Sequence, residues 1–183
     1  METDPLYEKV SAHLADPPSD PVPAWDPVNQ PMIRHWCDAM GDELPIYTDV
    51  EAARAAGHPD VVAPPAALQA WTMPGLRMRG FQDGTTRAQA ELVEAGYRAV
   101  VATNCEQTYH RYLTLGDHLY AVSRLDSVSS LKKTALGEGY FLTSITEYRT
   151  QHGELVGEMS FRTLWFKPAQ TQGSETQDAG QAS

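Results

Sequence analysis

The sequence has little cysteine and no long apolar run, and each of these shortages excludes a class of protein. Cys37 and Cys105 stand alone, without the CxxC spacing of a metal or redox motif, so we expect two unpaired thiols in a reducing compartment. No segment approaches the run of about 18 apolar residues that a membrane-spanning helix needs. The first residues, METDPLYEK, lack the basic start and apolar stretch of a signal peptide. We therefore expect a cytoplasmic protein that does not cross a membrane.

Basic residues are also scarce. The chain has 14 Lys and Arg against 24 Asp and Glu, which gives a net charge of -10. Nucleic-acid-binding domains usually carry a basic surface, so a nucleic-acid partner is not expected. The histidines lack a metal-like spacing such as HxxxH, and no metal site is expected either.

The sequence indicates one main domain of ordinary composition, flanked by two terminal segments of different character. The 183 residues are 42% hydrophobic, enough for a core without disulfides or metals. Residues 1–25 are expected to hold a short helix, over 4–15, and a proline-rich arm, DPPSDPVPAWDP (16–27), that lies extended on the surface. Residues 26–167 are expected to form the main domain. Residues 168–183 have the composition of a disordered tail or a linker.

Three helices are predicted in the first half of the main domain. A period of four in Met32, Trp36 and Met40, with Asn29 as a cap and Gly41 as a stop, predicts a helix over about 30–40. Val50 to Ala56 forms a second helix, which Gly57 ends. A third follows Pro64-Pro65, which fit the first turn of a helix. Residues 66–73 are apolar nearly all round, which predicts a deeply buried helix; the polar stretch RMRGFQDGTTRAQ then reads as a loop and AELVEAGYR as a short turn of helix.

From residue 97 the period changes from about four to two. Four segments rich in Val, Thr, Tyr, Phe and Trp read as strands, at 97–113, 119–131, 139–150 and 155–167. Short connections that contain glycine indicate consecutive antiparallel strands. Helices followed by antiparallel strands predict an α+β domain. The compact arrangement is a hot-dog fold, in which a curved antiparallel sheet wraps around a buried central helix.

Several segments of the chain resemble the MaoC-like enoyl-CoA hydratases, which are hot-dog proteins. The segments are PVNQPMIRHWCDAMGDELPIYTD, AARAAGHPDVVAPPAALQAWTMPGL, VVATNCEQTYHRYL and KKTALGEGYF. The last three are most similar to the N-terminal MaoC-like domain of the larger subunit of an actinobacterial heteromeric steroid side-chain hydratase. The resemblance covers about residues 26–167.

The resemblance implies a function that two kinds of chain share. It implies that the complex adds water to the side-chain double bond of a steroid (cholesterol-derived) acyl-CoA, with coenzyme A as part of the substrate and no other cofactor. It also implies a smaller catalytic MaoC-like partner subunit, with two copies of each chain. The larger subunit of such enzymes continues into a domain that docks an aldolase, whereas this sequence ends at Ser183, before any such domain.

The stretch GDELPIYTD (41–49) departs from the family's hydratase motif, Gly-Asp-x-Asn-Pro-(Ile/Leu)-His. Gly41, Asp42, Pro45 and Ile46 match the motif, but Leu44 replaces the Asn and Tyr47 replaces the His. Hydration needs a carboxylate that orients the water and an imidazole that titrates near neutral pH. A phenol has a reference pKa of about 10 and is a poor base at pH 7.

A second departure concerns the negative charge on the thioester oxygen. Active relatives commonly place His-Gly at the start of the central helix, where the Gly N–H stabilises that charge. In this chain the same place reads Val62-Ala63-Pro64-Pro65, and proline has no N–H. The two losses together predict that this chain contributes no catalytic residue. Asp42 then has a structural role, accepting backbone N–H bonds in the turn.

Other residues are candidates for the substrate. The small and proline side chains near the central helix would widen an acyl pocket, or would only let the helix pack close to the sheet; they are Ala63, Pro64, Pro65, Ala66, Ala67 and Ala70. Basic residues could meet the phosphates of coenzyme A; they are Arg77, Arg79, Lys132 and Lys133.

Two other functions remain open. A self-sufficient homodimeric hydratase or dehydratase would use Asp42 as a lone base with Tyr47 as acid, or with His110, which lies in a predicted strand. A non-catalytic acyl-CoA-binding scaffold that recruits an aldolase would need neither.

Overall fold

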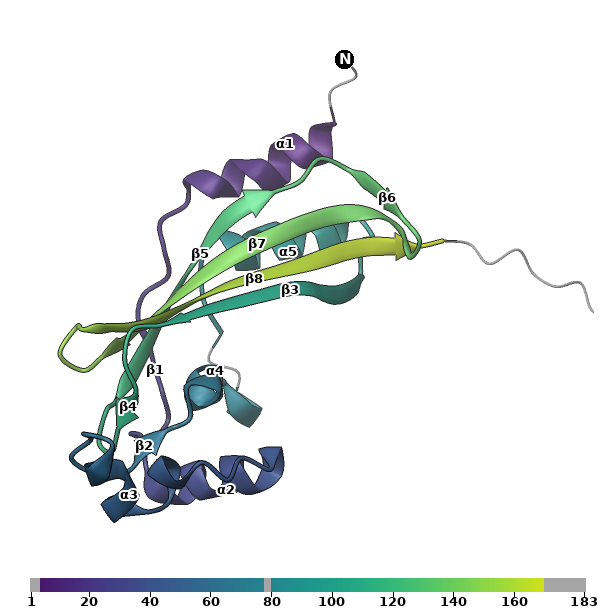
Figure 1. Ribbon diagram of the computed structural model, residues 1–183. Coiled ribbons are helices and arrows are strands. Elements are labelled where there is room, and N and C mark those ends of the chain that lie inside the picture. The colour runs from purple at the N-terminus through teal and green to yellow at the C-terminus, as the bar shows by residue number, and fades with distance from the viewer. Residues whose placement is uncertain (1–3, 78–79, 170–183) are drawn as a thin grey trace, which may run out of the picture.

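A curved antiparallel sheet forms the centre of the computed structural model, which describes residues 4–77 and 80–169 (Figure 1). Within those ranges the strand order is β1–β5–β7–β8–β3, and β6 pairs with β7. The strands are β1 (Val22–Pro23), β3 (Ala99–Tyr109), β5 (Leu119–Val128), β6 (Lys132–Thr134), β7 (Gly137–Thr150) and β8 (Leu155–Pro168). A separate short pair joins β2 (Val62–Ala63) to β4 (Leu113–Thr114). The predicted α+β class is confirmed.

The four long strands lie where the sequence pattern predicts them, but one of their pairings differs. β5, β7 and β8 are consecutive antiparallel neighbours, as expected. The first long strand, β3, pairs with β8 instead of β5. The prediction of purely consecutive pairing is therefore wrong, because residues 110–118 carry the chain from one side of the β7–β8 hairpin to the other. As a result β3 is left as an edge strand of the sheet.

The proline-rich arm is extended, as predicted, but it does more than lie on the surface. Its residues 22 and 23 form β1 and add an edge strand beside β5. Ala24 and Val28 are each only 3% exposed. Proline is tolerated in such a strand because an edge strand has one side without ladder hydrogen bonds.

The helices follow the predicted boundaries closely over residues 4–56, but not beyond them. They are α1 (Pro5–Ala12), α2 (Gln30–Met40), α3 (Val50–Ala55), α4 (Leu68–Trp71) and α5 (Gly84–Glu94), with short 3₁₀ turns η1 (His13–Ala15), η2 (Pro45–Tyr47), η3 (Pro65–Ala67) and η4 (Gly75–Arg77). Asn29 Oδ1 accepts from the Met32 N–H at 3.0 Å and caps α2. Gly41 ends α2 with a φ of +65°, a conformation that glycine adopts without strain.

The predicted buried helix over residues 66–73 is largely absent. Its place is taken by η3 and by α4, which has four residues. Ala66 and Met73 are exposed, while Leu68 and Trp71 are buried. The prolines before this segment and Pro74-Gly75 after it leave room for little more than two turns, so apolar composition alone did not indicate its length.

The longest helix against the sheet is instead α5, in a stretch that the sequence pattern assigned mostly to a loop. Asp83 Oδ1 accepts from the Thr86 N–H at 3.0 Å and caps it. Ala88 and Leu92, four residues apart, are fully buried. This buried stripe contains few apolar residues, and polar residues surround it. The hydrophobic pattern in the sequence was therefore too weak to indicate the helix.

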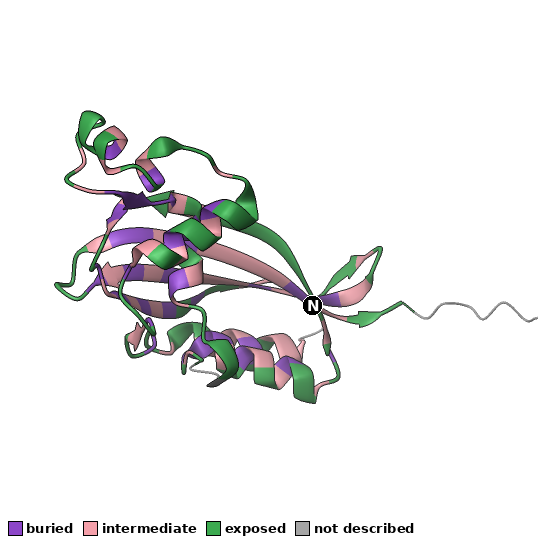
Figure 2. Ribbon diagram, turned by 90° about the horizontal axis from the view of Figure 1, so that it is seen from below, coloured by how far each residue is buried: buried purple, intermediate pink, exposed green. Residues whose placement is uncertain are grey.

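The inner face of the sheet carries two separate apolar cores. The first lies at the end of the sheet near α2 and α4, and it includes Tyr47, Trp71, Leu119 and Tyr148. The second lies at the other end, under α1 and α5, and it includes Leu92, Leu125 and Tyr140. Figure 2 shows buried and more exposed residues alternating along much of β5, β7 and β8, as expected for a sheet with one covered face.

Three turns at one end of the sheet are held by a single guanidinium group. Arg111, just after β3, donates to Asp117 Oδ2 at 2.7 Å and to Glu154 Oε2 at 2.8 Å. Burial acts to raise the pKa of the Asp117 carboxyl, but bonds from Arg111 and from Thr114 outweigh burial and leave this pKa lowered. Arg111 therefore joins the end of β3 to the turn before β5 and to the β7–β8 turn.

α4 approaches the sheet at a position where only glycine fits. A Cβ built on Gly157 of β8 would lie 2.6 Å from Leu68 Cδ2 and 2.9 Å from the Thr108 carbonyl oxygen. Leu68 is 2% exposed. The glycine in β8 therefore makes room for the side chain that anchors α4.

Replacing Arg111 by Met should lower the free energy of unfolding at pH 7 by about 1–3 kcal/mol, because it leaves the partly buried Asp117 carboxylate without its partner. The matched control is Arg124→Met, which breaks a pair with side chains 45% and 40% exposed and should cost less than about 1 kcal/mol. Because the pKa of Asp117 is lowered in the folded state, its stabilisation is present above about pH 3.9 and is lost as the pH falls through the folded-state pKa. Urea unfolding at pH 7 and pH 3 measures both effects; equal losses in the two variants at pH 7 would contradict this role.

Adding one methyl group at Gly157 should displace α4. Gly157→Ala is expected to destabilise the chain by about 1–3 kcal/mol through overpacking. Leu68→Ala in the same chain should recover part of that loss, which a double-mutant cycle measures as a favourable coupling. Gly80→Ala is the control, since a Cβ there meets no atom within 4 Å. Strictly additive losses from the two substitutions would show that Leu68 does not sense this position.

Candidate functional site

The degenerate hydratase motif forms the turn between α2 and η2. The Asp42 N–H donates to the Cys37 carbonyl at 3.0 Å, and Asp42 Oδ1 accepts from the Leu44 N–H at 3.2 Å. One carboxylate oxygen of Asp42 is thus engaged in the turn, as the sequence predicts. Asp42 is half-buried, so the carboxylate lies at the rim of the first core and not inside it.

Tyr47, at the position of the family's histidine, is buried. It is 5% exposed and lies in the first core. Burial, followed by the neighbouring Tyr112 and Asp42, raises the pKa of Tyr47 to about 12. The phenol is therefore neutral at pH 7, where it can donate a hydrogen bond but cannot take a proton from water.

An aromatic group that the sequence pattern did not indicate lies beside Tyr47. The ring centroids of Tyr47 and Tyr112 are 6.5 Å apart, and His58 meets Tyr112 edge to face at 5.2 Å. The His58 N–H donates to the Ala53 carbonyl at 3.0 Å and closes the end of α3. Tyr112 lies just before β4, so only the β2–β4 pairing brings it to this place, and spacing along the chain gives no sign of it.

The segment that replaces the His-Gly of active relatives is closed and short of donors. Ala63 is fully buried in β2, and Pro64 is among the fully buried side chains. Pro64 and Pro65 have no N–H, and the Ala67 N–H is used by the Pro64 carbonyl at 3.0 Å. Among the predicted pocket residues, Ala67 is buried, Pro65 and Ala70 are half-buried, and Ala66 is exposed.

His110 lies just beyond the end of β3. Its imidazole Nε2 is 3.3 Å from Glu158 Oε2, and its backbone N–H donates to the Val156 carbonyl at 3.0 Å. Glu158 alternates with the inward-facing Met159 along β8, so its side chain belongs to the outer face of the sheet. No contact of the described residues joins His110 to Asp42 or Tyr47.

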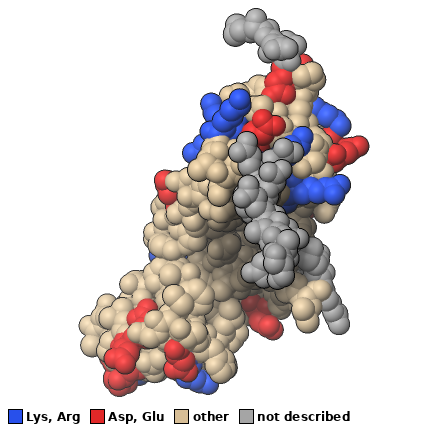
Figure 3. All heavy atoms as spheres, turned by 90° about the vertical axis from the view of Figure 1, so that its right-hand side faces the viewer, with Lys and Arg blue, Asp and Glu red and all other residues tan. Residues whose placement is uncertain are grey.

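Two of the four basic candidates, Lys132 and Lys133, lie far from the motif. Lys132 and Lys133 are exposed on β6, at the end of the sheet opposite α2 (Figure 1). Arg77 ends η4, and Arg79 lies outside the described residues. On the face in Figure 3, acidic side chains lie at both ends, whereas most Lys and Arg side chains lie at the end opposite α2 and α3.

A cavity of about 500 Å³ lies on the inner face of the sheet. One wall comes from strands β5, β7 and β8, and the other from α4, α5 and the segment between them. Its lining includes Gln69, Phe81, Thr85, Ser123, Thr146, Met159 and Phe161. None of these residues is a candidate from the sequence pattern, because they come from separate elements and only the curvature of the sheet brings them together.

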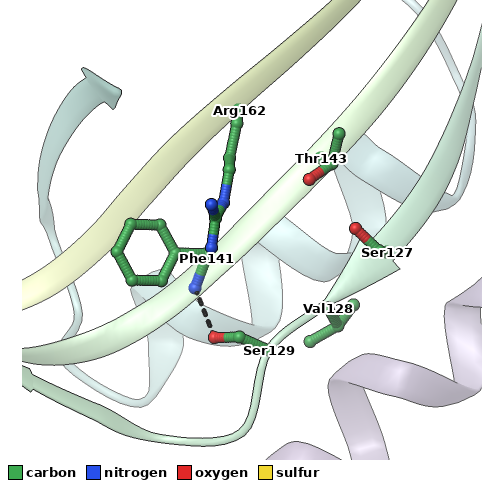
Figure 4. Close-up of a pocket in the computed structure, with 6 residues that line it drawn as sticks. All are labelled: Ser127, Val128, Ser129, Phe141, Thr143 and Arg162. Atoms are coloured by element: carbon green, nitrogen blue, oxygen red, sulfur yellow. Dashed lines mark hydrogen bonds between the residues drawn. The ribbon is translucent and has the colours of Figure 1, made fainter. Parts of the chain in front are cut away.

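A smaller hollow of about 260 Å³ lies on the opposite, outer face (Figure 4). Arg162 lies over the Phe141 ring at 4.2 Å from its centroid. Ser127 and Thr143 lie beside them, and the Ser129 hydroxyl accepts from the Phe141 N–H at 2.9 Å. This face is turned away from both cores.

Neither a metal-binding cluster nor a membrane-spanning helix is found in residues 4–77 and 80–169. No group of three or more His, Cys, Asp or Glu side chains in these ranges could hold a metal ion. No helix there is long and apolar enough to cross a membrane. Cys37 and Cys105 are free thiols, the first buried and the second exposed.

Comparison with known proteins identifies close relatives. Residues 22–159 match the family described as the FAS1-like dehydratase domain region. A 3-oxo-4,17-pregnadiene-20-carboxyl-CoA hydratase alpha subunit from Mycobacterium tuberculosis is 48% identical over 94% of this chain and 56% of its own length. A protein from Thermomonospora curvata described as a probable enoyl-CoA hydratase alpha subunit is 45% identical over 92% of this chain and 54% of its own. The chain thus spans about half the length of the curated relatives it matches.

Comparison with solved structures agrees with the sequence relatives. The ChsH1–ChsH2 complex from Mycobacterium tuberculosis contains a chain with a TM-score of 0.82 and 48% identity, over 90% of this chain and 96% of that one. A MaoC-like dehydratase from Rhodospirillum rubrum, at 18% identity, has a TM-score of 0.58 over 82% of this chain and 94% of its own, and shows the shared fold alone. The predicted hot-dog fold is confirmed.

Proposed function

Since this chain belongs to the FAS1-like dehydratase domain family, we propose that it is the non-catalytic subunit of a heteromeric enoyl-CoA hydratase. The proposed substrate is a steroid-derived acyl-CoA with a side-chain double bond, in line with the name of the 48% identical relative. One observation carries the division of labour: the residue at the position of the family's catalytic histidine is a buried tyrosine with a pKa of about 12.

Hydration places the hydroxyl of water on C3 of the enoyl group and a proton on C2. The step needs a group that accepts a proton near neutral pH and N–H donors for the thioester oxygen as it gains charge. Tyr47 is protonated at that pH, and Pro64 and Pro65 cannot donate. We therefore assign the catalytic Asp and His, and the oxyanion donors, to the partner subunit.

The edge strand β3 is the proposed contact with that partner. Its 11 residues are mostly exposed, and one of its two edges has no strand beside it within the described chain. A long free edge is a template for pairing with another chain. A partner of the same fold that added its own edge at β3 would continue the sheet, and the complex is proposed to hold two copies of each chain.

The inner cavity is the proposed acyl pocket. α4 has a single turn, so much of the inner face between the two cores is not covered by a central helix. A fused ring system is bulkier than a straight acyl chain and needs this space. Of the predicted pocket residues, Ala63 packs in the first core and Ala67 is buried, which favours the alternative that they let α4 approach the sheet.

No resident cofactor is needed, because hydration moves no electrons, and coenzyme A arrives with the substrate. Since the motif end is acidic on the face shown in Figure 3, basic groups of the partner are proposed to meet the coenzyme A phosphates there. The curated relatives are nearly twice as long, and a further domain that docks an aldolase is proposed for the whole protein. The complex is proposed to work in the cytoplasm.

The division of labour is tested by co-expressing this chain with a small MaoC-like partner and measuring hydration of a steroid enoyl-CoA. Asp42→Ala in this chain should change kcat/KM less than about threefold, whereas replacing the partner's catalytic Asp should lower it by about 10²-fold or more. Tyr47→Phe should leave the pH–rate profile unmoved. Turnover by this chain alone that Asp42→Ala abolishes would establish the self-sufficient hydratase. Binding of acyl-CoA that has no effect on the partner's turnover would establish the scaffold.

The β3 contact is tested by one exposed position. Val100 is 52% exposed, so Val100→Lys should leave the melting temperature of the isolated chain within about 2 °C. In the complex the added charge should weaken association at least tenfold in a sedimentation or titration measurement. Val93→Lys is the control, because Val93 is also exposed, at 37%, but lies on α5. Equal association constants for the two variants would place the interface elsewhere.

A further inference from the structure

The inward-facing positions of the two central strands change from apolar to polar and back. Along β5 they run Leu119, Ala121, Ser123 and Leu125, and along β7 they run Tyr140, Leu142, Ser144, Thr146 and Tyr148. The polar positions Ser144 and Thr146 are consecutive on the inner face of β7. Thr146 lies directly opposite Ser123, the polar position of β5, and Ser144 lies opposite Leu125. Three hydroxyls therefore form one patch between the two apolar cores.

These hydroxyls line the cavity without protein partners, and Ser144 is half-buried. Ser123 is 3% exposed and Thr146 is 4% exposed. Among residues 4–77 and 80–169, no hydrogen bond engages the side-chain oxygens of Ser123, Ser144 or Thr146. All three hydroxyls line the cavity, and apolar side chains at these positions would join the two cores and add hydrophobic burial. Stability therefore does not account for the patch.

The facing wall of the cavity is polar as well. Thr85 Oγ1 and Asp83 Oδ2 are buried atoms without hydrogen-bond partners, and both residues line the cavity. Amide groups of Gln69 and Gln89 line it too. Among the residues that the structure describes, no Lys or Arg lines the cavity, and the Asp83 carboxylate would repel an anion. The lining suits a neutral group that accepts hydrogen bonds.

An uninterrupted inner surface joins this patch to the exposed edge strand. Thr146 lies opposite Met159, and Met159 lies opposite Gln107 of β3. Gln107 Nε2 donates to Met159 Sδ at 3.5 Å, and Tyr109 donates its hydroxyl hydrogen to Gln107 Oε1. From Ser123 to Gln107 the path crosses three strand spacings, about 14 Å. That distance matches a rigid polycyclic group whose reactive end lies at the β3 edge.

We propose that Ser123, Ser144 and Thr146 form the polar end of the acyl pocket and donate hydrogen bonds to a carbonyl oxygen on the far ring of the acyl group. The inference rests on the proposed function, and it adds the part of the substrate that this chain selects. A site built to hydrogen-bond a substrate group discriminates strongly against the analogue that lacks it, because its own polar groups are then left unpaired.

The experiment compares two ring-fused acyl-CoA substrates that differ only in the far ring, one with a carbonyl and one with a methylene there. Turnover by the co-expressed complex gives kcat/KM, and calorimetry with the saturated, unreactive acyl-CoA of each type gives binding. The complex should prefer the carbonyl substrate at least 30-fold. Ser123→Ala with Thr146→Val should reduce kcat/KM for the carbonyl substrate at least tenfold and leave the methylene substrate within threefold.

The outer face supplies matched controls on the same two strands. Ser127→Ala with Thr143→Val removes the same chemical groups from the side turned away from the cavity, and it should leave the preference unchanged (Figure 4). Melting temperatures establish that both double variants fold. A Ser144→Ala single variant removes the third hydroxyl alone. It keeps the test possible if the double variant does not fold, and it should still reduce the preference for the carbonyl substrate.

The outcomes separate this inference from the proposed function. Turnover of both substrates with no preference, or equal losses on both in the Ser123/Thr146 variant, overturns the polar end while the hydratase assignment stands. A preference in binding that the Ser123/Thr146 variant removes, without turnover by any complex, supports the polar end and overturns hydration. Failure of the chain and its complex to bind either acyl-CoA overturns both.

Discussion

The inner face of the sheet is too long for one helix to cover. β7 and β8 have 14 residues each, about 46 Å of strand, whereas the 11 residues of α5 span about 16 Å. Hydrophobic burial is therefore achieved at two ends, by α2 and α4 at one and by α1 and α5 at the other. The cavity between them follows from this mismatch in length, and α4 packs closely against the sheet only at one end, where Leu68 lies over Gly157.

The motif end and the cavity have opposite chemistry. At the motif, Tyr47 lies among aromatic rings, and burial raises the pKa of its phenol to about 12. In the cavity, the strands present hydroxyls at positions that packing alone would fill with apolar side chains. A subunit whose partner supplies the catalytic residues keeps its fold and its shape complementarity, and its inner surface can then hold substrate groups far from the reacting bond.

Much of this fold could be predicted from the sequence because its signals are local. The cap at Asn29, the stop at Gly41 and the period of two after residue 97 placed α2 and the long strands correctly. The failures came from long-range effects. The pairing of β3 with β8 and the shortness of α4 depend on tertiary packing. The polar residues of α5, two threonines and a glutamine in its first half, made that helix resemble a loop. The motif's departures at Leu44 and Tyr47 were readable by resemblance, but the cavity was not, since its walls come from strands and helices far apart in sequence.

The unpartnered hydroxyls on the inner face also bear on how long the protein lasts. A ligand that satisfies them binds the folded chain and not the unfolded one, so it raises the free energy of unfolding by mass action, by about 2.7 kcal/mol at a free concentration 100 times the dissociation constant. Degradation in a cell commonly proceeds from transiently unfolded molecules. The lifetime of this subunit would then rise and fall with the supply of its ligand, without any regulatory site.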